Sequence, residues 1–295
     1  MERASSDREA MATAGEPVPR VKVRVAIPVR APRFDLSEVP REWLAGSSRA
    51  STIVNALSLI FPEGERFFIR AVKDHEAWWR DDPELTARVR GFFGQEGRHG
   101  HEHDRMNRML EAHGYEVEGF LRWYSALAYE RIEPMVPPHL RLATTVALEH
   151  MTSTLAEVAF TTEVLDDAHP SMRALLLWHA TEEIEHKSVT WDVLERVDPS
   201  MRTRVAGFAI ASAVLGLFWS TAYAMLLRQE RALPRPETRP DPAVLERFRR
   251  GVRRGIAITA RAVGQYLRPD FHPDEHDNSA LARDYVALAG LAPAG

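Results

Sequence analysis

Residues 94–103 read GQEGRHGHEH, and residues 178–187 read WHATEEIEHK. In each stretch a glutamate is followed three residues later by a histidine: Glu96 with His99, and Glu183 with His186. Residues three apart share one face of an α-helix, so each stretch places a carboxylate beside an imidazole. One such pair arises often by chance on a charged helix. Two pairs on different long helices indicate a metal site rather than solvated ion pairs.

Two other helical segments each carry one glutamate among apolar or small neighbours. Glu65 shares its helix face with Phe61 and Phe68, and Glu149 shares its face with Val146. A carboxylate buried alone in apolar surroundings is costly unless a cation neutralises it. We therefore expect both glutamates to point inward, towards bound cations.

The chain order is Glu, E-x-x-H, Glu, E-x-x-H, which is how ferritin-like four-helix bundles build a two-metal carboxylate site. The expected fold is all-α: a ferritin-like four-helix bundle with an additional long apolar helix and a C-terminal amphipathic helix. The expected cofactor is two divalent metal ions, with iron first and manganese as an alternative, since both accept these donors. The predicted ligands are Glu65, Glu96, His99, Glu149, Glu183 and His186.

Periodicity and helix breakers predict a chain made almost entirely of helices. The expected helices cover about 51–80, 83–113, 117–132, 139–166, 171–197, 205–227 and 243–267, with weak helical character from about 280. The sequence VKVRV at 21–25 is expected to be extended. Three segments follow: a disordered or extended N-terminal segment (1–35), the di-metal helical domain (36–231), and a Pro-rich linker with a helical extension (232–295).

Glycines at 91, 94, 97 and 100 interrupt the helix that carries the first E-x-x-H pair. Each costs about 1 kcal/mol relative to alanine in a helix. Close approach of a neighbouring helix or a π-bulge that re-aims a ligand would account for them. The alternative is a helix that breaks here.

Composition limits the kind of metal site, the partners and the location to be expected. The chain has no cysteine, so any metal must be held by nitrogen and oxygen donors. A net charge of −4 gives no reason to expect a nucleic-acid partner. The N-terminus lacks the apolar core of a signal peptide, so we expect a cytoplasmic location.

The uncharged stretch 205–227 qualifies that expectation, because its length would span a bilayer. The alternatives are a buried helix and one packed against a second subunit, so membrane anchoring and a homodimer both stay open. The basic helix over 243–267 is either a solvated helix on the bundle or one that lies on an anionic membrane surface.

The segments FPEGERFF, GQEGRHGHEH, ALEH and WHATEEIEHK resemble a bacterial family described as predicted metal-dependent hydrolases, within the ferritin-like di-metal superfamily. The resemblance covers about 51–197. The position of His179, four residues before Glu183, is similar to that of the extra histidine ligand of the di-iron arylamine N-oxygenases. This resemblance implies that His179 is a seventh ligand. His103, four residues after His99, is a further ligand, an outer-shell residue or a hydrogen-bonded core histidine.

The function expected first is a di-iron oxidoreductase that activates dioxygen to oxidise a small organic substrate. It would need an external electron donor, because the chain has no glycine-rich nucleotide loop. The alternative is a metal-dependent hydrolase in which a metal-activated water attacks an ester, amide or phosphate. Iron storage or a purely structural role is the third class. No residue beyond the metal ligands is assigned a catalytic role.

Overall fold

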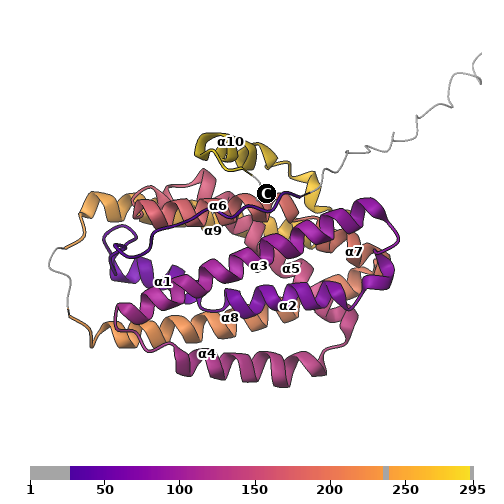
Figure 1. Ribbon diagram of the computed structural model, residues 1–295, viewed down its shortest axis with the longest axis horizontal. Coiled ribbons are helices and arrows are strands. Elements are labelled where there is room, and N and C mark those ends of the chain that lie inside the picture. Colours follow the sequence, from indigo (N-terminus) through magenta and orange to yellow (C-terminus); the bar gives the residue numbers. More distant parts are fainter. Residues whose placement is uncertain (1–26, 235–238, 293–295) are drawn as a thin grey trace, which may run out of the picture.

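The computed structural model describes residues 27–234 and 239–292, and the segment 21–25 lies outside them. Long helices dominate the part described (Figure 1). The prediction of an all-α chain is confirmed, since this part contains no strand and one isolated bridge, between Leu44 and Ala168. The α-helices are α1 (Ser48–Ser58), α2 (Phe61–Lys73), α3 (Pro83–Ala112), α4 (Glu118–Ser125), α5 (Pro138–Thr161), α6 (Pro170–His186), α7 (Val189–Val197), α8 (Met201–Glu230), α9 (Pro242–Tyr266) and α10 (Ser279–Ala289).

Helices α2, α3, α5 and α6 form the centre of the molecule. α2 packs on α3 and on α5, and α6 packs on α5 and on α3, so the four helices enclose a common interior. Helix starts are well specified: Asp82 caps α3 by accepting from the Leu85 N–H, and prolines occupy the first turns of α3, α5 and α6. The more specific assignment to the ferritin-like bundles stays a prediction, as does the division into three segments.

The expected helix over 51–80 is wrong as a single element, because the chain forms α1 and α2 with a break at Leu59 and Ile60. Pro62 explains the break. A proline inside a helix has no N–H to donate and its ring clashes with the carbonyl four residues earlier, here that of Ser58. The expected helix over 171–197 is likewise divided, into α6 and α7, and the one over 117–132 becomes α4 followed by the π-helix η2 (Ala126–Ile132).

Two glycines of α3, Gly91 and Gly94, admit the N-terminal segment rather than a helix, whereas Gly100 faces the neighbouring helix α2, where a Cβ atom would lie 3.1 Å from Glu65 Oε2. A Cβ atom on Gly91 would lie 2.5 Å from the carbonyl oxygen of Ile27, and one on Gly94 would lie 2.4 Å from Val29 Cγ2. Neither the predicted π-bulge nor a break occurs, since α3 is continuous over 30 residues. Residues 27–30 therefore lie directly on α3, one turn before its E-x-x-H pair.

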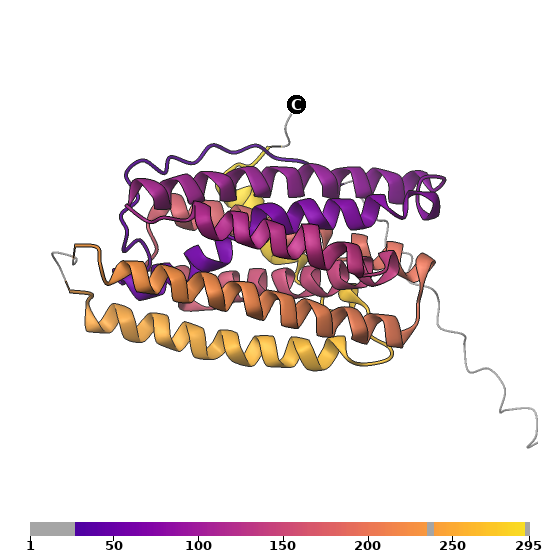
Figure 2. The same cartoon turned by 90° about the horizontal axis from the view of Figure 1, so that it is seen from below.

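Helix α8 extends beyond the predicted 205–227 and packs on α5 and α1 along one side. Figure 2 shows it in orange, running along the outside of the molecule. It is long and apolar enough to cross a membrane. Of the 18-residue stretch of α8 that is apolar enough to do so, 22% is buried. The core helix of a soluble protein passes the same test of length and composition. The cytoplasmic or membrane-anchored location of the chain thus stays a prediction.

Replacing Gly91 with alanine should destabilise the fold by about 1–3 kcal/mol, because the added methyl group would overlap the backbone of Ile27. Gly97→Ala is the matched control on the same helix: nothing lies within 4 Å of its Cβ position. It should raise stability by up to about 1 kcal/mol, the difference in helix propensity. Urea unfolding of both variants measures the two effects. Equal stability changes would contradict the close approach.

Candidate metal centre

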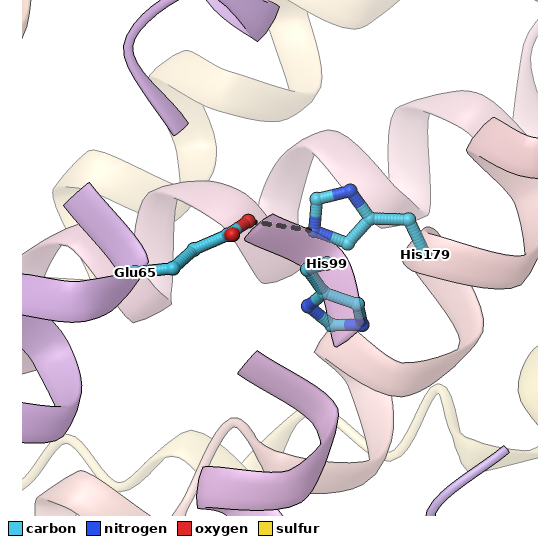
Figure 3. Close-up of side chains that lie close together, drawn as sticks. All are labelled: Glu65, His99 and His179. Carbon is cyan, nitrogen blue, oxygen red and sulfur yellow. Dashed lines mark ion pairs between the residues drawn. The ribbon is translucent and has the colours of Figure 1, made fainter. Parts of the chain in front are cut away.

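The seven predicted ligands converge in the interior enclosed by α2, α3, α5 and α6. Figure 3 shows three of them, Glu65, His99 and His179. Each of them is buried, with at most 6% of its surface exposed. α2 contributes one glutamate, α5 one glutamate, α3 an E-x-x-H pair, and α6 an E-x-x-H pair with the preceding histidine. The helix periodicity thus brings together residues from four helices, as the sequence predicts. The side chains are Glu65, Glu96, His99, Glu149, His179, Glu183 and His186.

These side chains form three overlapping groups, each of which offers three donor atoms within 4.8 Å of one another. Glu96 belongs to two groups and His99 belongs to two groups, so the three form one continuous cluster. Each of the three groups could hold a metal ion. The groups are Glu96 with Glu149 and His186, Glu96 with His99 and Glu183, and Glu65 with His99 and His179.

Close contacts run through the whole cluster. His186 Nε2 lies 3.2 Å from Glu96 Oε1 and 3.2 Å from Glu149 Oε2. At the other end, His179 Nε2 lies 2.7 Å from Glu183 Oε1 and 3.9 Å from Glu65 Oε1. The histidine that is expected only from the family resemblance is therefore part of the same cluster.

Unsatisfied polar atoms show that these residues fit a bound metal. Both carboxylate oxygens of Glu65, Glu96 and Glu149 are buried and have no hydrogen-bond partner. The Nδ1 atom of His99 is also buried without a hydrogen-bond partner. Leaving a buried polar atom without a partner costs about 1–3 kcal/mol, and more for a charged group. Divalent cations would satisfy all of these atoms at once. The donor set of carboxylates and imidazoles suits first-row metals such as iron, manganese or zinc.

The protons in the metal-free cluster are distributed unevenly. Burial raises the pKa values of Glu65 and Glu96 well above the usual range, and neighbouring carboxylates raise them further. Burial also raises the pKa of Glu149 to about 7. Burial opposes the ionisation of Glu183 too, but the charge of His186 and two histidine hydrogen bonds hold its pKa well below the usual range. Metal binding must therefore displace protons from the first three glutamates.

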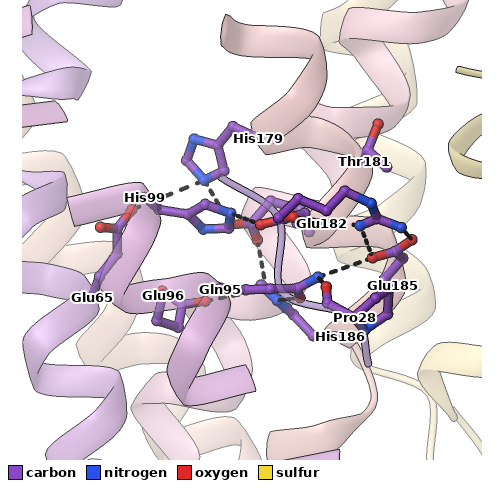
Figure 4. A network of polar contacts seen from close by, with 12 residues as sticks. Pro28, Glu65, Gln95, Glu96, His99, His179, Thr181, Glu182, Glu185 and His186 are labelled. Carbon is purple, nitrogen blue, oxygen red and sulfur yellow. Dashed lines mark hydrogen bonds and ion pairs between the residues drawn. The ribbon is translucent and has the colours of Figure 1, made fainter. Parts of the chain in front are cut away.

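A second layer of side chains orients the histidines (Figure 4). His99 Nε2 lies 3.0 Å from Glu182 Oε2, which leaves Nδ1 directed at the cluster. Arg30 holds Glu182 at 3.4 Å and Glu185 at 2.7 Å. On the other side, Gln95 Oε1 lies 3.0 Å from His186 Nδ1. Partners of this kind fix the ring orientation of metal-binding histidines.

Sequence reasoning missed this second layer. Gln95 and Glu182 each directly precede a predicted ligand glutamate, and that adjacency was the available signal. A residue one position along a helix points about 100° away, so it can reach the back of a ligand on the neighbouring helix. Arg30 had no signal, because it lies in the segment 1–35 for which no packing was expected.

Two other histidines take different positions. His103 is buried, with its Nδ1 atom 2.9 Å from Ser58 Oγ and its Nε2 atom 3.0 Å from His179 Nδ1. It lies 4.0 Å from Glu65, and its ring stacks on Phe61. It thus orients His179 within the core rather than joining the three groups. His101, two residues earlier on the same helix, is exposed.

Metal-free protein should lose stability as the pH rises from about 4.5 to 7, because the unfolded chain ionises Glu149 in this window while the folded chain keeps its proton until about pH 7. Saturating metal should reverse the trend, since the ionised carboxylate is then the favoured ligand. Melting temperatures with and without metal at pH 5.5 and pH 8 measure both effects. Glu149→Gln should make the metal-free profile less steep, and the remaining slope would come from Glu65, Glu96 and Glu182, whose pKa values burial also raises. An unchanged profile in this variant would contradict the assignment to Glu149.

Arg30→Met should weaken metal binding by about 10–100-fold, the usual effect of losing an outer partner of a ligand. Burial raises the pKa of Glu182 to about 8 although the Arg30 guanidinium lies beside it, and loss of this positive charge would raise the pKa further. The ionised form of Glu182, which is the better acceptor for His99, would then be populated less at any given pH. Arg33→Met, which changes an exposed arginine of the same segment, is the control. Competition with a chelator measures both affinities, and equal values would exclude a role for Arg30.

Comparison with known proteins gives one match. The model of a family described as "Predicted metal-dependent hydrolase" matches residues 28–277, which is most of the chain. No curated protein matches, and no solved structure matches. The match begins at the segment that lies on α3 and extends past α9, so it includes Arg30 and all seven predicted ligands.

Proposed function

The chain belongs to the predicted metal-dependent hydrolases, and we propose that it hydrolyses an ester, amide or phosphate bond at a two-metal centre held by the seven clustered side chains. The observation that carries the proposal is the set of buried carboxylate oxygens without hydrogen-bond partners. The family match supports hydrolysis, and nothing in the comparisons supports the dioxygen-activating oxidoreductase that is expected first from the sequence.

The chain's own residues have separable roles in this reaction. Bound metals would supply Lewis-acid polarisation of the substrate and a water that is nucleophilic near neutral pH. Glu149 and Glu96 would hold them from one side, with His186 between. Glu182 would accept the hydrogen bond from His99 Nε2 and so keep Nδ1 turned to the metal. The proton released by the attacking water would be taken up by a carboxylate of the cluster.

Thr152 gives the centre its contact with the substrate side. Thr152 lies on α5, and its hydroxyl donates a hydrogen bond to Glu183 of α6. Thr152 also lines an apolar cavity outside the cluster. Phe61 and Phe68 line the same cavity. These rings keep bulk water away from the carboxylates, which strengthens every charge interaction inside. A substrate would therefore reach the metals from the apolar side, past Thr152.

One observation favours a second function. The apolar wall formed by Phe61, Phe68 and Phe92 would also protect an oxidising intermediate from water, as a di-iron oxidation of an organic substrate requires. That reaction needs two irons and an external electron donor. It would use the same ligands, so ligand substitution alone does not distinguish it from hydrolysis.

The deciding experiment begins with the metal content of protein purified anaerobically. The protein is then loaded separately with iron, manganese and zinc. We expect about two metals per chain and turnover of a panel of acyl esters and phosphoesters without dioxygen. Consumption of dioxygen by the reduced iron form, with oxidation of an added substrate and no hydrolysis, would replace the hydrolase with the oxidase. Absence of bound metal would overturn both.

Glu149→Gln should lower turnover more than about 100-fold, beyond the range typical of outer partners, because one ligand of the centre is lost. Glu157→Gln is the matched control: it lies two turns along α5 and pairs with His276 outside the cluster. It should keep the metal content and most of the turnover. Full metal content and full turnover in Glu149→Gln would remove this glutamate from the site.

A further inference from the structure

An apolar cavity of about 100 Å³ lies between α2, the π-helix η2, α5 and α8. About 10–15 Å³ of such space admits one water, so the cavity is large enough for several heavy atoms in a row. Its α5 wall is a single helix face, formed by Thr144, Leu148, Met151 and Leu155 at spacings of three and four residues. These residues span about 16 Å along the helix axis. The cavity is therefore elongated along α5.

Helices α8 and α2 form other walls of the cavity. α8 contributes a row at four-residue spacing, Ile210, Val214 and Phe218. α2 contributes Phe61 and Gly64, and a Cβ atom on Gly64 would meet nothing closer than the Tyr124 hydroxyl at 4.0 Å. Three helices thus line one narrow, extended space, and the missing side chain at position 64 keeps it open.

One part of the cavity reaches the metal centre. Thr152 lines the cavity and hydrogen-bonds to Glu183. Phe61 also lines it and stacks on His103 with ring centroids 4.6 Å apart. Gly64 lines it next to Glu65 in the chain. A molecule in the cavity would contact residues of α2 and α5 that adjoin the clustered side chains.

Charged groups border the cavity at the start of α5, away from Thr152. Glu133 and Arg141 line it there, and each is already in an ion pair: Arg70 with Glu133 at 2.8 Å, and Arg141 with Asp74 at 2.9 Å. Each ion pair has no net charge, so neither pair offers a strong binding site for a charged substrate. Leu155, by contrast, is 36% exposed, which gives the cavity a contact with the surface further along α5.

We propose that this cavity binds one unbranched alkyl or acyl chain, and that the chain belongs to the substrate of the metal centre. An apolar space lined by two long rows of side chains, one on α5 and one on α8, matches an extended methylene chain better than a ring system or a polar metabolite. The reactive bond would then lie beside Thr152. This last step rests on the proposed hydrolase, whereas binding of the chain does not require metal or turnover.

The test uses the full-length chain without metal and cis-parinaric acid, a fluorescent unbranched fatty acid. We expect saturable binding of one molecule per chain. Val214→Trp, which fills the cavity from α8, should weaken binding about tenfold or more, equivalent to at least about 1.4 kcal/mol. Ala213→Trp is the matched control, since this neighbouring residue is exposed and does not line the cavity. Equal effects of the two substitutions, or no saturable binding, would overturn the proposal.

A second measurement does not depend on any variant folding. A fatty acid with a terminal photoreactive diazirine is cross-linked to the wild-type protein, and the labelled peptides are identified by mass spectrometry. Labels on the inner rows of α5 and α8 support the proposal, and labels confined to exposed apolar residues such as Leu288 contradict it.

Competition distinguishes two sources of the chain. Displacement of cis-parinaric acid by palmitate alone indicates a free fatty acid or its simple ester. Displacement by lysophosphatidylcholine as well indicates the acyl chain of a membrane lipid. Displacement by neither overturns the proposal. Two metals per chain in a protein that binds no fatty acid would leave the metal-dependent reaction standing and remove only the chain-binding cavity.

Discussion

The structure depends on the burial of four carboxylates and three imidazoles in one apolar interior. An isolated charge there would be prohibitively costly, and even a neutral carboxyl group needs a hydrogen-bond partner. Neither oxygen of Glu65, Glu96 or Glu149 has a hydrogen-bond partner, and their nearest charged groups are the clustered histidines. The four central helices thus enclose a set of donors whose charges and lone pairs match cations rather than one another. A stable core could have been built far more simply with leucine, so the arrangement reflects a requirement for metal.

That requirement extends outward from the donors. Each E-x-x-H histidine is held from behind, His99 by Glu182 and His186 by Gln95. The N-terminal segment fastens this layer through Arg30, and it can approach only because Gly91 and Gly94 have no side chains. The helix propensity lost at those glycines, about 1 kcal/mol each, is offset by the contacts they allow. The two glycines that lower the helix propensity of α3 therefore allow Arg30 to reach the side chains that orient the ligands.

Much of the fold and of the cluster could be predicted from the sequence, because helix periodicity is a local property. Glu65 and Glu149 were identified from their own neighbours, and the structure brings both to the same cluster. The break before Pro62 could have been predicted from the proline itself. By contrast, Arg30 meets Glu182 across 152 residues, and no local pattern encodes a contact of that kind. The chemistry was less accessible than the geometry, because hydrolysis and dioxygen activation use the same donors.

The distance in sequence between Arg30 and Glu182 also sets an order of events during synthesis. Ribosomes add about 5–20 residues per second, so roughly 8–30 s pass between the appearance of the arginine and that of its partner, 152 residues later. During this time the first E-x-x-H helix exists without the second. The nascent chain can hold neither the complete donor set nor its outer support until α6 has emerged. Completion of the donor set is thus a late event, and it requires that the N-terminal and central parts of the chain have come together.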